Sequence, residues 1–539
     1  MRLSQVKFKS WQVFSLFLVL GLLLFTSSLW TSFLSDDWHW LYLAKNTNWS
    51  WQIFATNYEG LNLGGSYNPL LLIIFKVFYS LFGLHSGAYH FVSILLHALN
   101  ALIIYLLAQK IFVLAKIKNH YLSIIAGALF LIWPTQVETI NWLAAWPHLW
   151  MTTFYLSSFL FYLIWRSDKK ARFFILSLVL FLAALFTKEL AISLPLVILL
   201  WEIYFVSTNK KYKQKTWITS YWLILALFLS MRLSATQLLF GYYGQSDLRW
   251  QLLQWFGNLL VFINEFFTWS YLRIFIYKVW YHGIDSLVIV GLSLLALYFF
   301  YTYYYKKWWQ FIMVNSALLI LAPLVPLGLH RTTFGGERYL YLASGFFIIW
   351  LIAIFSKVKI KRQLLGILLL IIIPTIAYKN IIWQQASLVS DQIMSSFTKL
   401  EIEDKARLIS VGLPDNLAGA EVFRNNLQQA LELTYPEYSG QIIHLPVYTA
   451  LNNKNFNDHL LKWREDEMGW FAESVDGSFV VTGQTSIIVN DIYFELWNYN
   501  YQNYTANIIR LMPTDELRQQ IKDEDIHWLT YDQGKLQIK

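Results

Sequence analysis

Two adjacent carboxylates follow directly on a long apolar run near the start of the chain. The run extends from Trp11 to Leu34, and Ser35, Asp36 and Asp37 come next. A charge beside hydrocarbon loses its hydration, so such an acid usually has a functional role or caps a helix. Ser35 or Asp36 could cap a short helix over 38–45, but one cap needs only one side chain. The remaining carboxylate is therefore a candidate general base.

Further charged and imidazole side chains stand beside later apolar runs. Glu138 follows a Trp-Pro pair, where a carboxylate also suits the dipole of a helix start. Lys188 and Glu189 are adjacent, and each could instead neutralise other groups nearby. His90 and His97 are seven residues apart and share one helical face, where buried, hydrogen-bonded histidines are commoner than metal ligands.

Three arginines are candidates for binding an anion. Arg331 and Arg338 belong to one short loop that contains glycines at 335 and 336, which let a backbone approach a ligand closely. A guanidinium fork can hold two phosphate oxygens at once. Arg232 stands near the end of an apolar run and could simply extend its charge into the interface. For Arg338 the structural alternative is an ion pair with Glu337 or another acid that only fixes the loop.

The amino-acid composition is typical of an integral membrane protein. The 539 residues are 57% hydrophobic and 14% charged, and apolar runs of membrane-spanning length recur along the chain. The absence of cysteine excludes disulfides, thiolate catalysis and cysteine-based metal sites. The first apolar run is too long for a signal-peptide core and reads as an uncleaved first helix. We therefore expect a polytopic, multi-pass helical protein of the cell membrane.

Short basic connections between the apolar runs fix the expected orientation. The positive-inside rule places these connections and the N-terminus in the cytoplasm. Apolar segments 69–84 and 250–278 contain charges, so we expect an outer helix and a re-entrant segment there rather than single crossings. Most acids before residue 379 then fall on the outer side, which favours an outer polar cavity. About eleven crossings are expected: 11–34, 87–110, 121–134, 141–165, 172–187, 190–206, 217–237, 284–305, 309–328, 339–356 and 363–378.

The charge balance changes sign towards the C-terminus. Residues 379–539 carry 13 basic and 22 acidic residues, whereas the preceding part is strongly basic. Two such different environments do not form one basic surface, so nucleic acid is not an expected partner. We predict a membrane domain at 1–396, with a first outer loop and juxtamembrane helix at 35–86. A small extracytoplasmic α/β domain follows at 397–539.

Strands and helices can be placed within the C-terminal domain from periodicity. We expect strands over 406–413, 441–447, 478–489 and 526–530, and helices over 418–433 and 514–522. All acid and base candidates precede Tyr341, so this domain is not expected to contain the reaction centre.

Several short motifs together resemble the C-superfamily of membrane glycosyltransferases (GT-C), closest to TMTC-type and bacterial protein O-mannosyltransferase-like members. The resemblance covers roughly residues 12–395, and the ordered set is more specific than any one motif. Segment 415–426 also resembles a stretch in the outer tails of bacterial relatives, with no chemistry attached. The motifs are Ser35-Asp36-Asp37, Tyr67-Asn68-Pro69-Leu70, Leu81-Phe82-Gly83-Leu84, Tyr89-His90, Leu96-His97-Ala98, Trp133-Pro134-Thr135-Gln136-Val137-Glu138-Thr139, Phe186-Thr187-Lys188-Glu189, Leu194-Pro195 and Glu337-Arg338-Tyr339-Leu340-Tyr341.

The resemblance implies transfer of a sugar, mannose being one option, from a polyprenyl-phosphate donor to a protein or glycan acceptor on the outer face. A carboxylate can accept the acceptor's proton, and cations can stabilise the departing phosphate. A second acid could hold a divalent cation, Mg²⁺ or Mn²⁺, and Asp37 and Glu138 are the candidates. The roles are then: catalytic Asp36, Asp37 and Glu138; phosphate-binding Arg338, Arg331, Arg232 and Lys188; supporting Glu189, His90, His97 and Tyr341.

Two other classes of membrane protein share part of this pattern. A lipid-linked glycan flippase or other transporter would show paired repeats and polar residues at the bilayer midplane. A glycan ligase or polymerase using lipid-diphosphate donors would need the same groups at the outer interface. The transferase is the leading hypothesis because no repeat is detected and the polar residues concentrate near one surface.

Overall fold

The computed structural model divides the chain into two compact units, which are described separately. One comprises residues 1–29 and 43–379, and the other comprises 30–42 and 380–539. The main division between the units therefore follows residue 379, within helix α16 (Arg362–Phe397). The boundary predicted after residue 396 lies at the end of the same helix. The structure describes residues 8–58, 66–117, 121–208, 217–237, 252–271, 291–292, 298, 308–327, 335–355, 362–451, 461–475, 478–481, 486–498, 505–523 and 525–539.

The first unit is helical throughout its described part, which confirms the predicted mostly helical class. Its longer helices are α1 (Ser10–Phe25), α3 (Pro69–Phe82), α4 (Ser86–Leu114), α5 (Tyr121–Leu131), α7 (Trp146–Asp168), α8 (Ala171–Thr187), α9 (Leu194–Thr208), α10 (Ile218–Thr236), α11 (Leu252–Thr268), α14 (Trp308–Leu321), α15 (Tyr341–Phe355) and the first half of α16. The short ones are η1 (Thr26–Trp30), η2 (Trp51–Phe54), η4 (Pro134–Gln136), α6 (Val137–Asn141), η5 (Leu143–Ala145), η6 (Glu189–Ser193), η7 (Ala322–Leu324) and η8 (Glu337–Leu340).

The helices support a multi-pass membrane protein. In the described residues, six helices are long and apolar enough to cross a bilayer, or seven if a bent pair forms one span. Three shorter apolar helices, among them α3 in the predicted outer-helix segment, add to these. The predicted crossing at 284–305 lies almost wholly outside the described residues, so eleven crossings and their orientation stay predictions.

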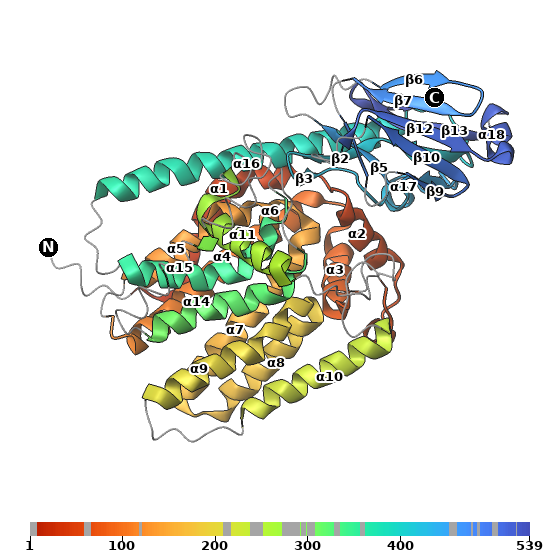
Figure 1. Cartoon of the computed structure of the whole chain (residues 1–539). Coiled ribbons are helices and arrows are strands. Elements are labelled where there is room, and N and C mark those ends of the chain that lie inside the picture. The colour runs from red at the N-terminus through yellow and green to blue at the C-terminus, as the bar shows by residue number, and fades with distance from the viewer. Residues whose placement is uncertain are drawn as a thin grey trace. The chain divides into compact units, whose positions relative to one another are not determined.

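The central helices of this unit are α4 and α15, and most of their side chains are buried. Figure 1 shows α7 running beside α8 and α9, in agreement with the contacts that α7 makes with each. Gly127 on α5 permits a close approach of α1 and α4, because a Cβ there would meet the Phe17 ring at 2.7 Å and the Ala101 carbonyl oxygen at 2.8 Å. Tight packing of this kind leaves little freedom for polar groups at the helix ends.

A break between α5 and α7 positions Glu138. The pair Tyr121–Leu131 and Pro134–Asn141 is bent by 47°. Pro134 begins η4, where its fixed φ and missing N–H suit a first helical position. The chain then forms α6, whose first turn contains Glu138. The predicted proximity of Glu138 to a helix start is therefore confirmed, on a helix shorter than expected.

The second unit confirms a C-terminal region of sheets with two helices. It also contains the start of α2 (Asp36–Asn46), which carries the two adjacent aspartates. The helices beyond α16 are α17 (Leu427–Thr434) and α18 (Asp515–Lys522). The strands are β1 (Arg407–Val411), β2 (Leu413–Leu417), β3 (Ala420–Glu421), β4 (Ile442–His444), β5 (Val447–Leu451), β6 (Leu461–Glu465), β7 (Trp470–Ser474), β8 (Ser478–Val481), β9 (Ser486–Val489), β10 (Ile492–Trp497), β11 (Thr505–Ala506), β12 (Ile508–Pro513), β13 (Ile526–Asp532) and β14 (Lys535–Ile538).

These strands form three sheets. A four-stranded sheet has the order β14-β13-β1-β4, in which β1 is parallel to both β13 and β4. Two five-stranded sheets have the orders β6-β7-β12-β10-β9 and β11-β8-β5-β2-β3. Gly412 joins β1 to β2 with a φ of 67°, which a side chain would oppose, and so lets the chain pass from one sheet to another. Ile409, Phe494 and Trp528 belong to the shared apolar core.

Several sequence predictions in this unit are wrong. The single strand expected over 478–489 is divided into β8 and β9, which belong to different sheets. We expected a helix over 418–433, but α17 begins only at Leu427. Before it the chain makes a tight turn at Ala418 and Gly419, with φ values of 50° and 102°, and pairs β3 with β2. Asn426 has a φ of 70°, which a right-handed helix does not allow. The helix therefore cannot extend from Leu427 back through Asn426. The turn geometry overrides the helical periodicity.

Candidate functional site

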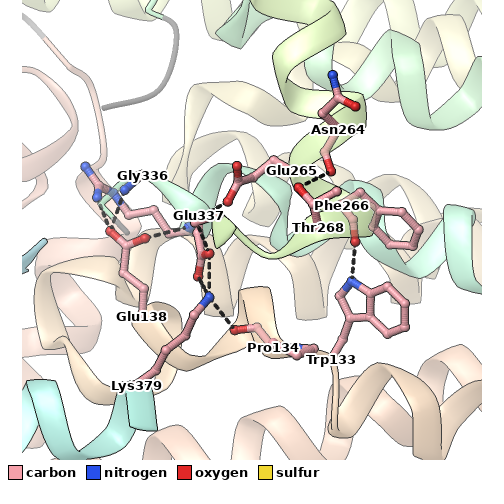
Figure 2. Close-up of polar contacts among 12 residues, drawn as sticks. Trp133, Pro134, Glu138, Asn264, Glu265, Phe266, Thr268, Gly336, Glu337 and Lys379 are labelled. Atoms are coloured by element: carbon pink, nitrogen blue, oxygen red, sulfur yellow. Dashed lines mark hydrogen bonds and ion pairs between the residues drawn. The ribbon is translucent and has the colours of Figure 1, made fainter. Parts of the chain in front are cut away.

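Glu138 and Arg338, which are 200 residues apart, meet in the helical unit. The carboxylate of Glu138 accepts hydrogen bonds from the backbone N–H groups of Gly336 (3.2 Å) and Arg338 (2.9 Å) and forms an ion pair with the Arg338 guanidinium (Figure 2). Glu138 is 3% exposed, whereas the Arg338 side chain is 19% exposed. The guanidinium also lies 4.8 Å and 4.7 Å from the rings of Trp142 and Tyr339. The partner of Arg338 is thus Glu138, and not its neighbour Glu337.

Glu337 turns to a second, fully buried cluster. The Nζ atom of Lys379 on α16 lies 2.5 Å and 2.7 Å from its two carboxylate oxygens, and Ser270 donates to it at 2.6 Å (Figure 2). Ser270 also contacts Glu265 of α11. Two carboxylates and one ammonium leave this cluster with an excess negative charge when all are ionised. The cluster anchors η8 through Glu337, whereas Glu138 contacts the same segment through Gly336 and Arg338.

A third acid–base pair joins α10 to the start of η6. Arg232 donates from Nε to a carboxylate oxygen of Glu189 at 2.6 Å, and the backbone N–H of Tyr67 donates to the same oxygen at 3.0 Å. Lys188 precedes this glutamate directly. The His148 imidazole lies within electrostatic reach of both Lys188 and Arg338, and its ring meets that of Tyr339 edge-on at 5.5 Å.

These contacts place the charged groups at one level of the helical unit. Two apolar segments of membrane-spanning length, Glu189–Ser207 and Glu337–Phe355, begin at the residues just described. His148 links those two starts, and Arg232 lies near the end of α10. Glu202 instead pairs with Arg166 at 2.7 Å, at the opposite ends of α7 and α9. The predicted distribution of the acids between the outer and the cytoplasmic side of a membrane stays a prediction.

His97 and Tyr341 form a buried hydrogen-bonded pair between α4 and α15. His97 Nδ1 lies 2.7 Å from the Tyr341 hydroxyl, and Nε2 lies 3.0 Å from the Leu131 carbonyl oxygen. Because a carbonyl only accepts, Nε2 carries the proton and Nδ1 accepts from Tyr341. Both imidazole nitrogens are thereby engaged in the core. His90 lies nearer the start of α4, with Nδ1 3.4 Å from the Ile140 carbonyl oxygen.

No metal centre is assembled in the part of the chain that the structure describes: it contains no group of three or more acidic or histidine side chains able to hold an ion. A cation held through Asp37 and Glu138 stays a prediction. Arg331, the other arginine of the 331–338 loop, lies outside the described residues.

Asp36 and Asp37 belong to the second unit and have different surroundings there. Asp37 is fully buried, and its Oδ2 accepts the backbone N–H of Leu34 at 2.9 Å, so it braces the start of α2. Asp36 is half-buried, and its Oδ1 accepts the side-chain amide of Asn426 at 3.0 Å. Burial lowers the pKa of His39, one turn further along, although the charge of Asp36 opposes the shift. Of the two acids, Asp36 is therefore the more accessible to solvent.

Three contributors were missed in the sequence. Lys379 follows an expected crossing at 363–378 directly and could have been recognised as a lone cation beside an apolar run. Ser270 and Asn426 carry no comparable signal, because serine and asparagine are common in turns.

Comparison with known proteins gives one local match. No protein-family model matches the chain. A stretch of 129 residues is 30% identical to part of Protein O-mannosyl-transferase Tmtc1 from Drosophila melanogaster, and it covers 24% of this chain and only 14% of that protein. This similarity agrees with the resemblance to TMTC-type glycosyltransferases seen in the motifs.

Two solved structures show a faint overall likeness. ArnT from Cupriavidus metallidurans, bound to undecaprenyl phosphate, aligns with a TM-score of 0.39 and 12% identity over 82% of this chain and 93% of that chain. The archaeal oligosaccharyltransferase AglB from Archaeoglobus fulgidus, in complex with an inhibitory peptide and a dolichol-phosphate, aligns with a TM-score of 0.40 and 11% identity over 89% and 75%. Scores this low carry no conclusion about fold or activity.

Proposed function

We propose that this protein is a membrane glycosyltransferase that transfers a sugar, mannose in the first instance, from a polyprenyl-phosphate donor to a hydroxyl of a protein or glycan acceptor on the outer face of the membrane. The observation that carries the proposal is the position of Arg338 and Lys188. Arg338 is the second residue of one membrane-spanning segment, Lys188 directly precedes another, and both act electrostatically on His148. That is the level at which the phosphate of a lipid-linked sugar lies.

The electrostatics of this cluster fit a departing phosphate. Arg338 is held in orientation by Glu138 and two aromatic rings, yet its side chain keeps 19% of its surface exposed. A guanidinium fixed in this way can bind two phosphate oxygens without reorganising as negative charge develops on them. Arg232 and Lys379 are more deeply buried against Glu189 and Glu337, and they serve the shape of the site rather than the ligand.

The reaction needs one further group, a base for the acceptor. In the proposed step the acceptor oxygen forms a bond to the anomeric carbon, and its proton passes to a carboxylate. The bond from that carbon to the phosphate oxygen breaks, and its electron pair leaves with the phosphate. Asp36 is assigned as this base because Asp37 is occupied by the Leu34 N–H and buried, whereas Asp36 is half-buried.

Purified protein in nanodiscs, supplied with polyprenyl-phosphate mannose and cell-envelope acceptor, should release polyprenyl phosphate and label the acceptor. Polyprenyl-phosphate glucose in a parallel reaction tests the choice of sugar. Asp36→Asn should lower turnover by about 10²–10⁴-fold, as expected for the loss of a general base. Asp37→Asn is the matched control: its amide oxygen can still accept the Leu34 N–H, so the loss should be much smaller. Full activity of Asp36→Asn would refute the assignment of the base.

A further inference from the structure

Segment 415–426, which resembles a stretch in bacterial relatives but has no assigned role, forms a braced hairpin. After β2 the chain turns at 418–419, where the Gly419 N–H donates to the side-chain oxygen of Asn416 at 3.0 Å. The pairing of β2 with β3 continues beyond the strands through the Val422 N–H to Asp415 O (3.0 Å) and the Phe423 N–H to Pro414 O (2.9 Å). The hairpin is therefore fixed by hydrogen bonds along its whole length.

An ion pair between a buried carboxylate and a partly exposed arginine fixes the end of this hairpin. Asp415 is 1% exposed and receives both Nε and a terminal nitrogen of Arg424, the latter at 2.8 Å. The guanidinium also lies over the Tyr448 ring, 5.8 Å from its centre. Two parallel hydrogen bonds between guanidinium and carboxylate fix direction as well as distance. The backbone that follows Arg424, including Asn426, is held in place accordingly.

The braced hairpin contacts the segment that carries Asp36, and both belong to the same compact unit. The Ser35 N–H donates to the Val422 carbonyl oxygen at 2.9 Å. Asn426 donates from Nδ2 to Oδ1 of Asp36 at 3.0 Å. Asn426 reaches Asp36 from a left-handed conformation, with a φ of 70°, which asparagine tolerates better than most residues. A conformation of this kind is retained where surrounding contacts require it.

We propose that Asn426 is a positioning residue for Asp36, so that the C-terminal domain supplies part of the catalytic machinery; this inference rests on the proposed function. The amide bond to Oδ1 fixes the carboxylate rotamer and leaves Oδ2 to receive the proton of the acceptor hydroxyl. Orientation of a reacting group within a fraction of an ångström contributes strongly to rate. This proposal departs from the expectation that the domain contains no part of the reaction centre.

The test compares variants of the full chain in the polyprenyl-phosphate mannose assay. Asn426→Gly keeps the left-handed backbone and removes the amide, and it should lower kcat by about 10- to 100-fold, the range for a hydrogen bond to a charged group, with the donor KM unchanged. Asn426→Asp keeps the shape but places a carboxylate against Asp36, and it should lower kcat further. Asn490→Gly is the matched control, since Asn490 has a φ of 47° in the exposed turn between β9 and β10.

A double variant separates positioning from a purely structural role. In an Asp36→Asn background, Asn426→Gly should cause no further loss, because the base that it orients is already gone. Two results would overturn the inference and leave the proposed function standing. One is that the losses of the two single variants add in the double variant. The other is a wild-type kcat in Asn426→Gly or Asn426→Asp while Asp36→Asn is inactive. A wild-type protein that releases no polyprenyl phosphate from any sugar donor overturns both.

Discussion

Replacing Lys379 by methionine tests the buried cluster beneath η8. Lys379 and Glu337 are 2% and 1% exposed, and Glu265 adds a second buried carboxyl to the same cluster. Lys379→Met keeps the length of the side chain but removes its charge. Removing one partner of a buried ion pair typically costs about 3–5 kcal/mol, because the other charge is left without compensation.

The pH dependence of this cost can be worked out separately. A carboxyl left without its cation can take up a proton instead of staying ionised. We therefore expect Lys379→Met to lose about 3–5 kcal/mol of stability at pH 7 and less at pH 5, where a bound proton can replace the missing cation.

Unfolding of the full chain in mixed micelles, followed by tryptophan fluorescence at both pH values, measures this loss. The neutral double variant Lys379→Met with Glu337→Gln should recover most of it at pH 7. Glu265→Gln is the control, since it lowers the negative charge and keeps the Glu337–Lys379 pair. A Lys379→Met protein as stable as the wild type at pH 7, or a double variant that recovers nothing, would refute the argument that this pair carries a buried charge.

Two further outcomes are expected. Arg338→Lys should lower turnover by about 10- to 100-fold and donor binding much less, because lysine cannot reproduce the fork as charge develops on the phosphate; equal losses in both, measured by single-turnover kinetics and donor titration, would indicate ground-state binding only. Burial lowers the pKa of His444 to about 4. The folded protein is therefore most stable, as far as this histidine is concerned, above pH 6.5, where the imidazole is neutral in both the folded and the unfolded chain. As the pH falls towards 4, the unfolded chain takes up the proton first, and the folded state loses at most about 3 kcal/mol. Thermal unfolding of wild type and His444→Asn between pH 7.5 and 4.5 should show a smaller pH dependence in the variant.

The sequence predicts which side chains gather at one end of the helices, but not how they pair. Helix positions of Glu138, Glu189 and Glu337 follow from apolar runs and basic loops, which are local signals. The partners Arg338, Arg232 and Lys379 are 200, 43 and 42 residues away, and the choice among them depends on helix packing. Adjacent residues such as Glu337 and Arg338 look like a natural pair in sequence, yet neighbouring side chains on a helix point in different directions.

The strands of the C-terminal domain were predicted only in part, for a similar reason. Strand β10 alternates buried Ile492, Phe494 and Leu496 with less buried neighbours, and β12 alternates likewise. Each is amphipathic with period two, but short, charged and aromatic-rich segments of this kind compete with helical patterns. The turn at 418–419 could be placed only once its pairing partners were known, since it depends on contacts across the hairpin.

Two pairs of adjacent charged residues in this chain each combine a buried member with a more exposed one. Consecutive residues of a helix are rotated by about 100° from one another, so the two side chains cannot serve the same ligand. In the pair 36–37, Asp37 is turned back to the Leu34 N–H, and Asp36 is left half-buried beside Asn426. In the pair 337–338, Glu337 is buried against Lys379, and Arg338 keeps an exposed edge. The buried member fixes the backbone at the point where its neighbour must be held still. Under the proposed function, each of the two pairs then consists of one group that meets the substrate and one that anchors it.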